Sequence, residues 1–148
     1  MTIPIYPLAP EHDAVTVLAR TRAVIDALGP FDTWMGDSAG AGMALALAQM
    51  HPSPPPLVLL SPWLDIGLDN PDIAAFDARD PWLSRPGLRE CGRLYAKSLD
   101  AADPRVSPLH GPLEGIPRIS IFIGTRDLFV PDARKLRSRS PATVSLTE

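Results

Sequence analysis

Hydrophobic residues along the chain follow two patterns, a helical spacing and short continuous runs. In residues 14–28 apolar side chains recur at three- and four-residue intervals, with Arg20 and Arg22 elsewhere, which predicts a helix with one solvated face. Gly29-Pro30 then ends this helix, since a glycine followed by a proline is a common helix stop. Residues 39–50 are small and apolar on all sides, which is typical of a buried helix.

Short apolar runs predict the strands of a sheet. The candidate strands are residues 1–6, 33–35, 57–60, 119–123 and 142–147, and two more helices are predicted over 86–99 and 131–139. In the first of these helices the expected apolar side carries Leu88, Cys91, Leu94, Tyr95 and Leu99. Proline- and aspartate-rich loops are expected over 61–80 and 100–117. Because helices and strands alternate, the predicted class is α/β, with a mostly parallel sheet flanked by helices.

Length and composition fit one globular domain over residues 1–148, with 45% hydrophobic and 21% charged residues. A formal net charge of −3 does not indicate the basic surface with which proteins bind nucleic acid. The longest apolar run, residues 39–50, is too short to cross a bilayer, and the sequence opens without a leader pattern. Cys91 is the single cysteine, which excludes an intrachain disulfide. We therefore expect a cytoplasmic protein without a membrane span.

The motif with chemical content is Gly36-Asp37-Ser38-Ala39-Gly40, a G-x-S-x-G sequence between a short apolar run and a buried helix. This context is typical of a nucleophile elbow, a sharp strand-to-helix turn that exposes the serine hydroxyl. Small residues are expected at both glycine positions because a Cβ would clash within the turn. The backbone N–H of Ala39 would then face a developing oxyanion at a helix N-terminus. The alternative is a glycine-rich turn in which Ser38 only caps the helix.

Four segments in order resemble the hormone-sensitive-lipase-like family of α/β-hydrolases, which contains esterases and lipases. They are the GDSAG motif at 36–40, Tyr6-Pro7-Leu8-Ala9-Pro10-Glu11-His12, Ser61-Pro62-Trp63-Leu64-Asp65 and Gly124-Thr125-Arg126-Asp127. The resemblance implies a partial α/β-hydrolase fold and a serine carboxylic-ester hydrolase acting on short acyl esters. Matched to the family pattern, Ser38 is the nucleophile, Asp127 the acid and Ala39 one oxyanion donor. Asp37 belongs to the elbow signature and is expected to anchor the turn.

Two parts of the family pattern have no match in the sequence. The family order is serine, then acid, then histidine, but residues 128–148 contain no histidine. His12, His51 and His110 all precede Asp127, and we expect them to be solvated loop residues. The family's H-G-G-G-type loop, which completes the oxyanion hole, would precede Tyr6. Residues 1–148 therefore correspond to one partial domain without the front strands, that loop and the histidine segment.

Rival interpretations follow from these gaps and from other residue patterns. Without its base, Ser38 keeps an ordinary hydroxyl, so the chain could be an inactive hydrolase fragment that at most binds ligands or partners. Asp127 could also be a structural residue that only caps a helix or a turn. A phosphate loop is excluded because the glycines at 40 and 42 lack the required spacing. A metal site is not expected because the aspartates of residues 65–80 lack the spacing of a calcium loop.

The expected partners are a small ester substrate and a second copy of the chain, with no cofactor and no metal. Trp63, Trp82 and Tyr95 are candidate walls of a hydrophobic acyl site, although core packing is an alternative for at least two of them. Self-association is expected through an exposed sheet edge, because the strand before Gly36 would lack a neighbour on one side.

Overall fold

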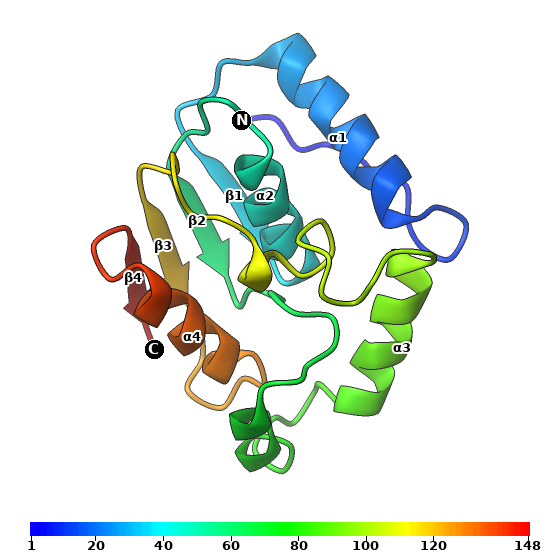
Figure 1. Ribbon diagram of the computed structural model, residues 1–148, viewed down its shortest axis with the longest axis vertical. Helices are drawn as coiled ribbons and strands as arrows, with labels where there is room; N and C mark the ends of the chain where they lie inside the picture. Colours follow the sequence, from blue (N-terminus) through cyan, green and yellow to red (C-terminus); the bar gives the residue numbers. More distant parts are fainter.

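The computed structural model describes all residues 1–148 as an α/β unit with one parallel sheet (Figure 1). The sheet has four strands in the order β1-β2-β3-β4, which is also their order in the sequence, and every neighbouring pair is parallel. The strands are β1 (Trp34–Asp37), β2 (Leu57–Leu60), β3 (Ile119–Phe122) and β4 (Val144–Thr147). The predicted α/β class with helices flanking a mostly parallel sheet is confirmed.

The chain has four helices, of which α2 and α4 pack against strands of the sheet. They are α1 (Ala14–Leu28), α2 (Ala39–Gln49), α3 (Arg85–Ala96) and α4 (Val130–Arg139). The first helix has the predicted limits because both ends carry local signals. The Asp13 side chain accepts a hydrogen bond from the Thr16 amide at 2.9 Å, and Gly29 ends the helix. None of these helices combines the length and the hydrophobicity that a membrane-spanning segment needs.

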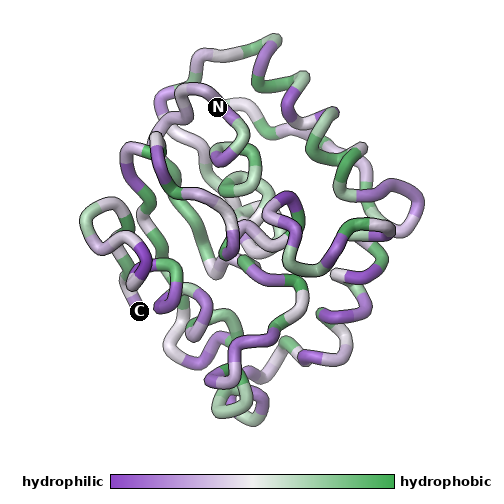
Figure 2. Tube along the Cα trace, viewed as in Figure 1, coloured by the Kyte–Doolittle hydropathy of each residue, from purple (hydrophilic) through white to green (hydrophobic).

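The hydrophobic core lies between the sheet and the helices that pack on it. Leu45 of α2, Leu57 and Leu59 of β2, Ile119 of β3 and Leu136 of α4 are almost completely buried. Figure 2 shows hydrophobic residues gathered along the strands and α2. Along α3 and α4, hydrophobic residues alternate with hydrophilic ones. The prediction that α2 is a buried helix is confirmed, since seven of its eleven residues are buried.

The predicted strand over residues 1–6 is wrong. Residues 1–7 form no backbone–backbone hydrogen bond and belong to no strand. Pro4 and Pro7 remove two donors, and the sheet offers no partner because β1 is an edge strand that pairs only with β2.

The loops and α3 also differ from expectation. Each predicted loop contains a short 3₁₀ helix, η1 (Pro71–Ala75) and η2 (Pro108–His110). The third helix ends at Ala96, because Lys97 adopts a positive φ of 57°. Its buried residues are Gly92 and Ala96, whereas Cys91 is exposed and its predicted apolar neighbours are half-buried. Gly92 packs so closely against Ile66 that a Cβ at position 92 would lie 2.8 Å from the Cβ of Ile66. A larger residue would therefore clash on this side of the helix.

Candidate active site

Ser38 occupies a sharp turn between β1 and α2, as predicted. Its backbone has φ 52° and ψ −116°, a conformation that residues with a side chain rarely adopt. Hydrogen bonds with the end of β2 and with the loop after it hold Ser38 there. The Ser38 amide donates to the carbonyl oxygen of Leu60 at 2.9 Å, and the Ser38 carbonyl accepts from the Trp63 amide at 3.1 Å. Ser38 is therefore held in a fixed turn directly before α2, where it is half-buried. Ala39, which is exposed, is the first residue of that helix.

The two glycines of the motif have different roles. A Cβ on Gly36 would lie 2.3 Å from the carbonyl oxygen of Gly40, so only glycine fits there. A Cβ on Gly40 would have only the Tyr6 hydroxyl near it, at 3.9 Å, which is an ordinary contact. The prediction of a clash within the turn is thus right for Gly36 and wrong for Gly40, because Gly40 already belongs to α2 and a Cβ there meets only the Tyr6 hydroxyl.

Asp37 does not anchor the turn through its side chain. Its carboxylate is exposed and makes no hydrogen bond or ion pair in the structure. The main-chain bonds of Ser38 to Leu60 and Trp63 supply that anchoring instead.

Asp127 lies in the turn that follows β3. Its backbone amide donates to the carbonyl of Gly124 at 2.9 Å, and its Oδ1 accepts from the amide of Phe129 at 2.8 Å. Oδ2 has no hydrogen-bond partner within the chain. The carboxylate is half-buried, so one oxygen fixes the turn and the other is available to orient a further group.

The sheet brings Ser38 and Asp127 to the same end, where the carboxyl termini of its strands lie. They follow the carboxyl ends of β1 and β3, which lie on either side of β2. Two strand spacings correspond to about 10 Å between the strand axes. In open parallel sheets, ligands bind outside this carboxyl edge.

Trp63 links the two turns. Besides its amide bond to the Ser38 carbonyl, its indole ring stacks on Phe129 with ring centroids 6.1 Å apart and an interplanar angle of 16°. Phe129 in turn donates its amide to Asp127. A continuous set of contacts therefore runs from the Ser38 turn to the Asp127 turn.

Asp80 supports the Asp127 turn from the loop before α3. Its Oδ2 accepts from the amide of Leu128, and its Oδ1 accepts from the amides of Trp82 and Leu83. Partial burial acts to raise the pKa of Asp80, but these backbone donors outweigh it and lower the pKa. Sequence analysis missed this role, because a bond spanning 48 residues leaves no local signal.

No histidine completes the pair. His51 packs edge-on against Trp34 at the amino end of β1, with centroids 5.3 Å apart. Nε2 of His110 lies 3.6 Å from Oδ2 of Asp65. Neither these imidazoles nor that of His12 forms a hydrogen bond or ion pair with Ser38 or Asp127. His12 and His51 are half-buried loop residues, whereas His110 belongs to η2 and has an acidic partner that the sequence did not predict.

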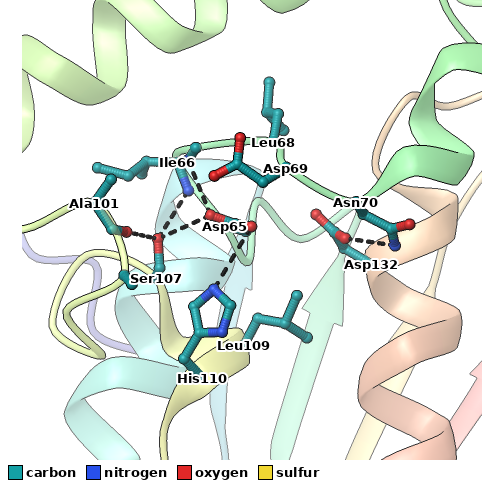
Figure 3. A network of polar contacts seen from close by, with 12 residues as sticks. Asp65, Ile66, Leu68, Asp69, Asn70, Ala101, Ser107, Leu109, His110 and Asp132 are labelled. Atoms are coloured by element: carbon teal, nitrogen blue, oxygen red, sulfur yellow. Dashed lines mark hydrogen bonds and ion pairs between the residues drawn. The ribbon is translucent and has the colours of Figure 1, made fainter.

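Asp65, the acidic partner of His110, belongs to a buried polar network (Figure 3). Asp65 is 4% exposed and accepts from the hydroxyl of Ser107 at 3.2 Å, and Ser107 also accepts from the amide of Ile66 at 2.9 Å. Beside it, Oδ1 of the fully buried Asp132 accepts from the Asn70 amide group at 2.9 Å, whereas Oδ2 has no partner. Burial raises the pKa of Asp132 to about 6, opposed by the Asn70 hydrogen bond.

The candidate acyl-site aromatics divide into two groups. Trp63 and Tyr95 line a cavity of about 270 Å³ that also touches Ala39. Trp82 is 89% exposed and lies outside this cavity, so its prediction as a wall is wrong. The structure contains no cluster of three His, Cys, Asp or Glu side chains placed to bind a metal ion.

Comparison with known proteins gives the family. A model for the alpha/beta hydrolase fold matches residues 1–145. The chain therefore belongs to the α/β-hydrolase family, and its likeness to the hormone-sensitive-lipase-like esterases and lipases is confirmed.

Individual relatives agree with this family. The chain is 32% identical to an esterase of Acinetobacter venetianus over 147 residues, which is 91% of this chain and 48% of the relative. It is 36% identical to an acetyl-hydrolase of Streptomyces hygroscopicus over 109 residues, 70% of this chain and 36% of the relative. Among solved structures, a hormone-sensitive lipase from a metagenome library superimposes with a TM-score of 0.83 and 30% identity, covering 96% of this chain and 52% of that one. The chain spans about half the length of the relatives it matches, or less.

Proposed function

We propose that this chain carries the nucleophile and the acid of a serine carboxylic-ester hydrolase. The observation that carries the proposal is the strained backbone of Ser38, held at the carboxyl edge of the sheet beside the turn that bears Asp127. A backbone conformation that costs roughly 1–3 kcal/mol is retained where surrounding bonds enforce it, and such positions cluster at reactive sites. The esterase, acetyl-hydrolase and lipase names of the relatives support the same chemistry.

Each residue has a defined role in this proposal. The Ser38 hydroxyl oxygen attacks the ester carbonyl carbon while an imidazole takes its proton, and the carbonyl oxygen becomes an oxyanion. The Ala39 amide at the start of α2 donates to that oxyanion, where the helix dipole also favours negative charge. The free oxygen of Asp127 orients the imidazole and stabilises it once it is protonated.

The imidazole itself does not come from residues 1–148 in this proposal. His51 and His110 have other partners, and residues 128–148 contain no histidine. Without a base the Ser38 hydroxyl is not activated, so the 148-residue chain alone is expected to be inactive and at most to bind ligands. Esterase chemistry then requires a histidine-bearing segment in addition to these residues.

Hydrolysis of a short p-nitrophenyl ester tests both parts. The chain alone should hydrolyse p-nitrophenyl acetate no faster than its Ser38→Ala variant. The chain is then completed at both ends with the flanking segments of the Acinetobacter venetianus esterase, and the same comparison is repeated. Completion should produce hydrolysis that Ser38→Ala lowers by at least about 10³-fold and Asp127→Asn by about 10²–10⁴-fold.

Two results would contradict the proposal. A folded, completed chain whose hydrolysis survives Ser38→Ala would reject Ser38 as nucleophile. Hydrolysis by the 148-residue chain alone that Ser38→Ala removes would reject the requirement for an outside histidine. Circular dichroism on every variant shows whether a lost rate reflects chemistry or unfolding.

A further inference from the structure

A cavity of about 560 Å³ lies at the amino end of β1, the opposite end from the one that Ser38 follows. Its walls come mainly from two loops, residues 29–34 between α1 and β1 and residues 51–56 between α2 and β2, which run side by side (Figure 1). Ile25 and Asp26 of the last turn of α1 complete the lining. The volume falls within the range of roughly 300–1,000 Å³ that is usual for small-molecule sites.

The cavity carries a negative charge that nothing in its wall compensates. No lysine or arginine lines it. Asp26 is neutralised by Arg22, whose Nε donates to Oδ1 at 2.9 Å. The exposed carboxylate of Asp32, in contrast, takes part in no hydrogen bond or ion pair. His51 uses its Nδ1 to accept from the Ser53 amide at 3.1 Å. Asp32 therefore presents a free negative charge to a ligand in the cavity.

The carboxyl end of α1 adds partial negative charge at the same place. Its last turn contains no basic residue. The Gly29 amide donates to the carbonyl of Ile25 at 2.9 Å, but no backbone amide of residues 30–33 donates to this turn. Carbonyl groups left unpaired at the C-terminus of a helix favour a cation. The helix end and Asp32 therefore attract the same kind of ligand.

The rest of the wall is aromatic and aliphatic carbon. Phe31 and Trp34 are half-buried and line the cavity together with prolines 54–56 of the other loop. The Trp34 amide donates to the carbonyl of Pro56 at 3.1 Å, which ties the two loops together. Aromatic rings attract cations and also pack against apolar groups. This wall therefore suits the hydrocarbon part of a ligand that also carries a positive charge.

We propose that this cavity binds a small organic cation with an aromatic ring, of the arylalkylamine class. The ammonium group lies at Asp32 and the end of α1, and the ring lies against Phe31 and Trp34. Asp32 and the helix end oppose an anion, and an inorganic cation leaves the aromatic and proline walls without a partner. The site does not depend on Ser38, so it goes beyond the proposed ester hydrolysis and stands or falls separately from it.

Titration of the ¹⁵N-labelled chain with phenethylamine at neutral pH, where the amine is charged, tests the proposal by nuclear magnetic resonance. The indole N–H resonance of Trp34, identified by its loss in Trp34→Phe, should shift until it saturates. The resonance of Trp82, which is 89% exposed and outside the cavity, should not move.

Matched ligands separate the contributions of charge and ring. The neutral 2-phenylethanol and the ringless ethylamine should each bind about tenfold more weakly than phenethylamine. The anion 3-phenylpropanoate should produce no shift. Raising NaCl from about 0.01 M to 1 M, which shortens the Debye length from about 30 to 3 Å, should weaken phenethylamine binding and leave 2-phenylethanol binding unchanged.

Two variants locate the ligand. Asp32→Asn should raise the Kd of phenethylamine about fivefold and leave that of 2-phenylethanol unchanged. The fold should be unaffected, because the Asp32 carboxylate is exposed and unbonded. Phe31→Leu keeps an apolar side chain but removes the ring, and should also raise the Kd of phenethylamine about fivefold. Glu11→Gln is the control, because Glu11 is an exposed acid outside the cavity.

Three outcomes would overturn the inference. One is the absence of a saturable Trp34 shift with phenethylamine up to about 20 mM, a concentration that detects a Kd in the millimolar range. Another is binding that Asp32→Asn and Glu11→Gln change equally, or that 2-phenylethanol matches. The third is tighter binding of Nα-acetyl-lysine methylamide than of phenethylamine, which would assign the cavity to a lysine side chain of a protein partner. None of these outcomes bears on Ser38, whose test is the hydrolysis assay of the completed chain.

Discussion

At the scale of single residues, Asp132 is a carboxylic acid enclosed by protein with one oxygen unpaired. Burial disfavours its charged form more than Asn70, Lys135 and His110 favour it, and Asp65 adds repulsion. Its pKa is therefore raised from 3.8 to about 6 in the folded chain. The folded state then binds more protons than the unfolded state between about pH 4 and pH 6, so this residue makes stability fall as pH rises through that window.

Asp132→Asn should remove this dependence. The amide is uncharged at every pH, and its oxygen can still accept the hydrogen bond from Asn70. Above pH 7 we expect the free energy of unfolding to rise by up to about 3 kcal/mol, which is the pKa difference converted at 1.36 kcal/mol per unit. Below pH 4 the two proteins should be nearly equal.

Urea unfolding at pH 4 and pH 8 measures the difference. Asp32→Asn is the control, because Asp32 is exposed and its carboxylate has no hydrogen bond. A variant that is destabilised at both pH values would show instead that Asp132 is held charged by the network of Figure 3.

At the scale of elements, the turn between β1 and α2 depends on one glycine rather than two. In Gly36→Ala the new Cβ would meet backbone atoms of Gly40 and Ala41 at 2.3–2.5 Å, and backbone cannot move aside as a flexible side chain can. In Gly40→Ala the Cβ has only the Tyr6 hydroxyl at 3.9 Å, and alanine favours a helix over glycine by about 1 kcal/mol.

Only the first of these two variants should therefore destabilise the fold. We expect Gly36→Ala to lower the free energy of unfolding by more than 2 kcal/mol or to prevent folding, as overpacking against backbone does. Gly40→Ala should leave the melting temperature unchanged or raise it. Thermal unfolding by circular dichroism compares them, and similar losses in both would mean that the turn is tighter than the structure shows.

The sequence predicted the elements whose signals are local. The first helix has a cap at Asp13 and a stop at Gly29, and the second has the small, apolar composition of a buried helix. Both helices were therefore found where they were expected. Residues 1–6 failed because a strand also needs a partner, which no local pattern reveals. The elbow was predictable from five residues, whereas the support of Asp127 by Asp80 depends on a contact across 48 residues.

At the scale of the whole molecule, more surface is exposed than a compact chain of this mass requires. The accessible surface is 7996 Å² for 16.0 kDa, whereas the scaling for monomeric proteins gives about 7,400 Å². Part of the excess lies at the β1 edge, where Met35 is 66% exposed, and in the unpaired segment before α1, where Ile3 and Ile5 are 72% and 101% exposed. A free strand edge with apolar neighbours is a template for pairing with another chain.

We therefore expect the isolated chain to self-associate through the β1 edge. Size-exclusion chromatography with light scattering should give a mass above 16.0 kDa that rises with protein concentration. Met35→Lys should shift the equilibrium toward the monomer without lowering the melting temperature of the monomer, because a lysine on an edge strand opposes pairing and the site is solvent-exposed. Trp82→Lys removes an apolar side chain that is 89% exposed on another part of the surface, so it should leave association unchanged. If both substitutions act equally, general stickiness rather than the sheet edge drives association. A monomer at all concentrations, with a sharp thermal transition, would show that four strands and their helices already close the core.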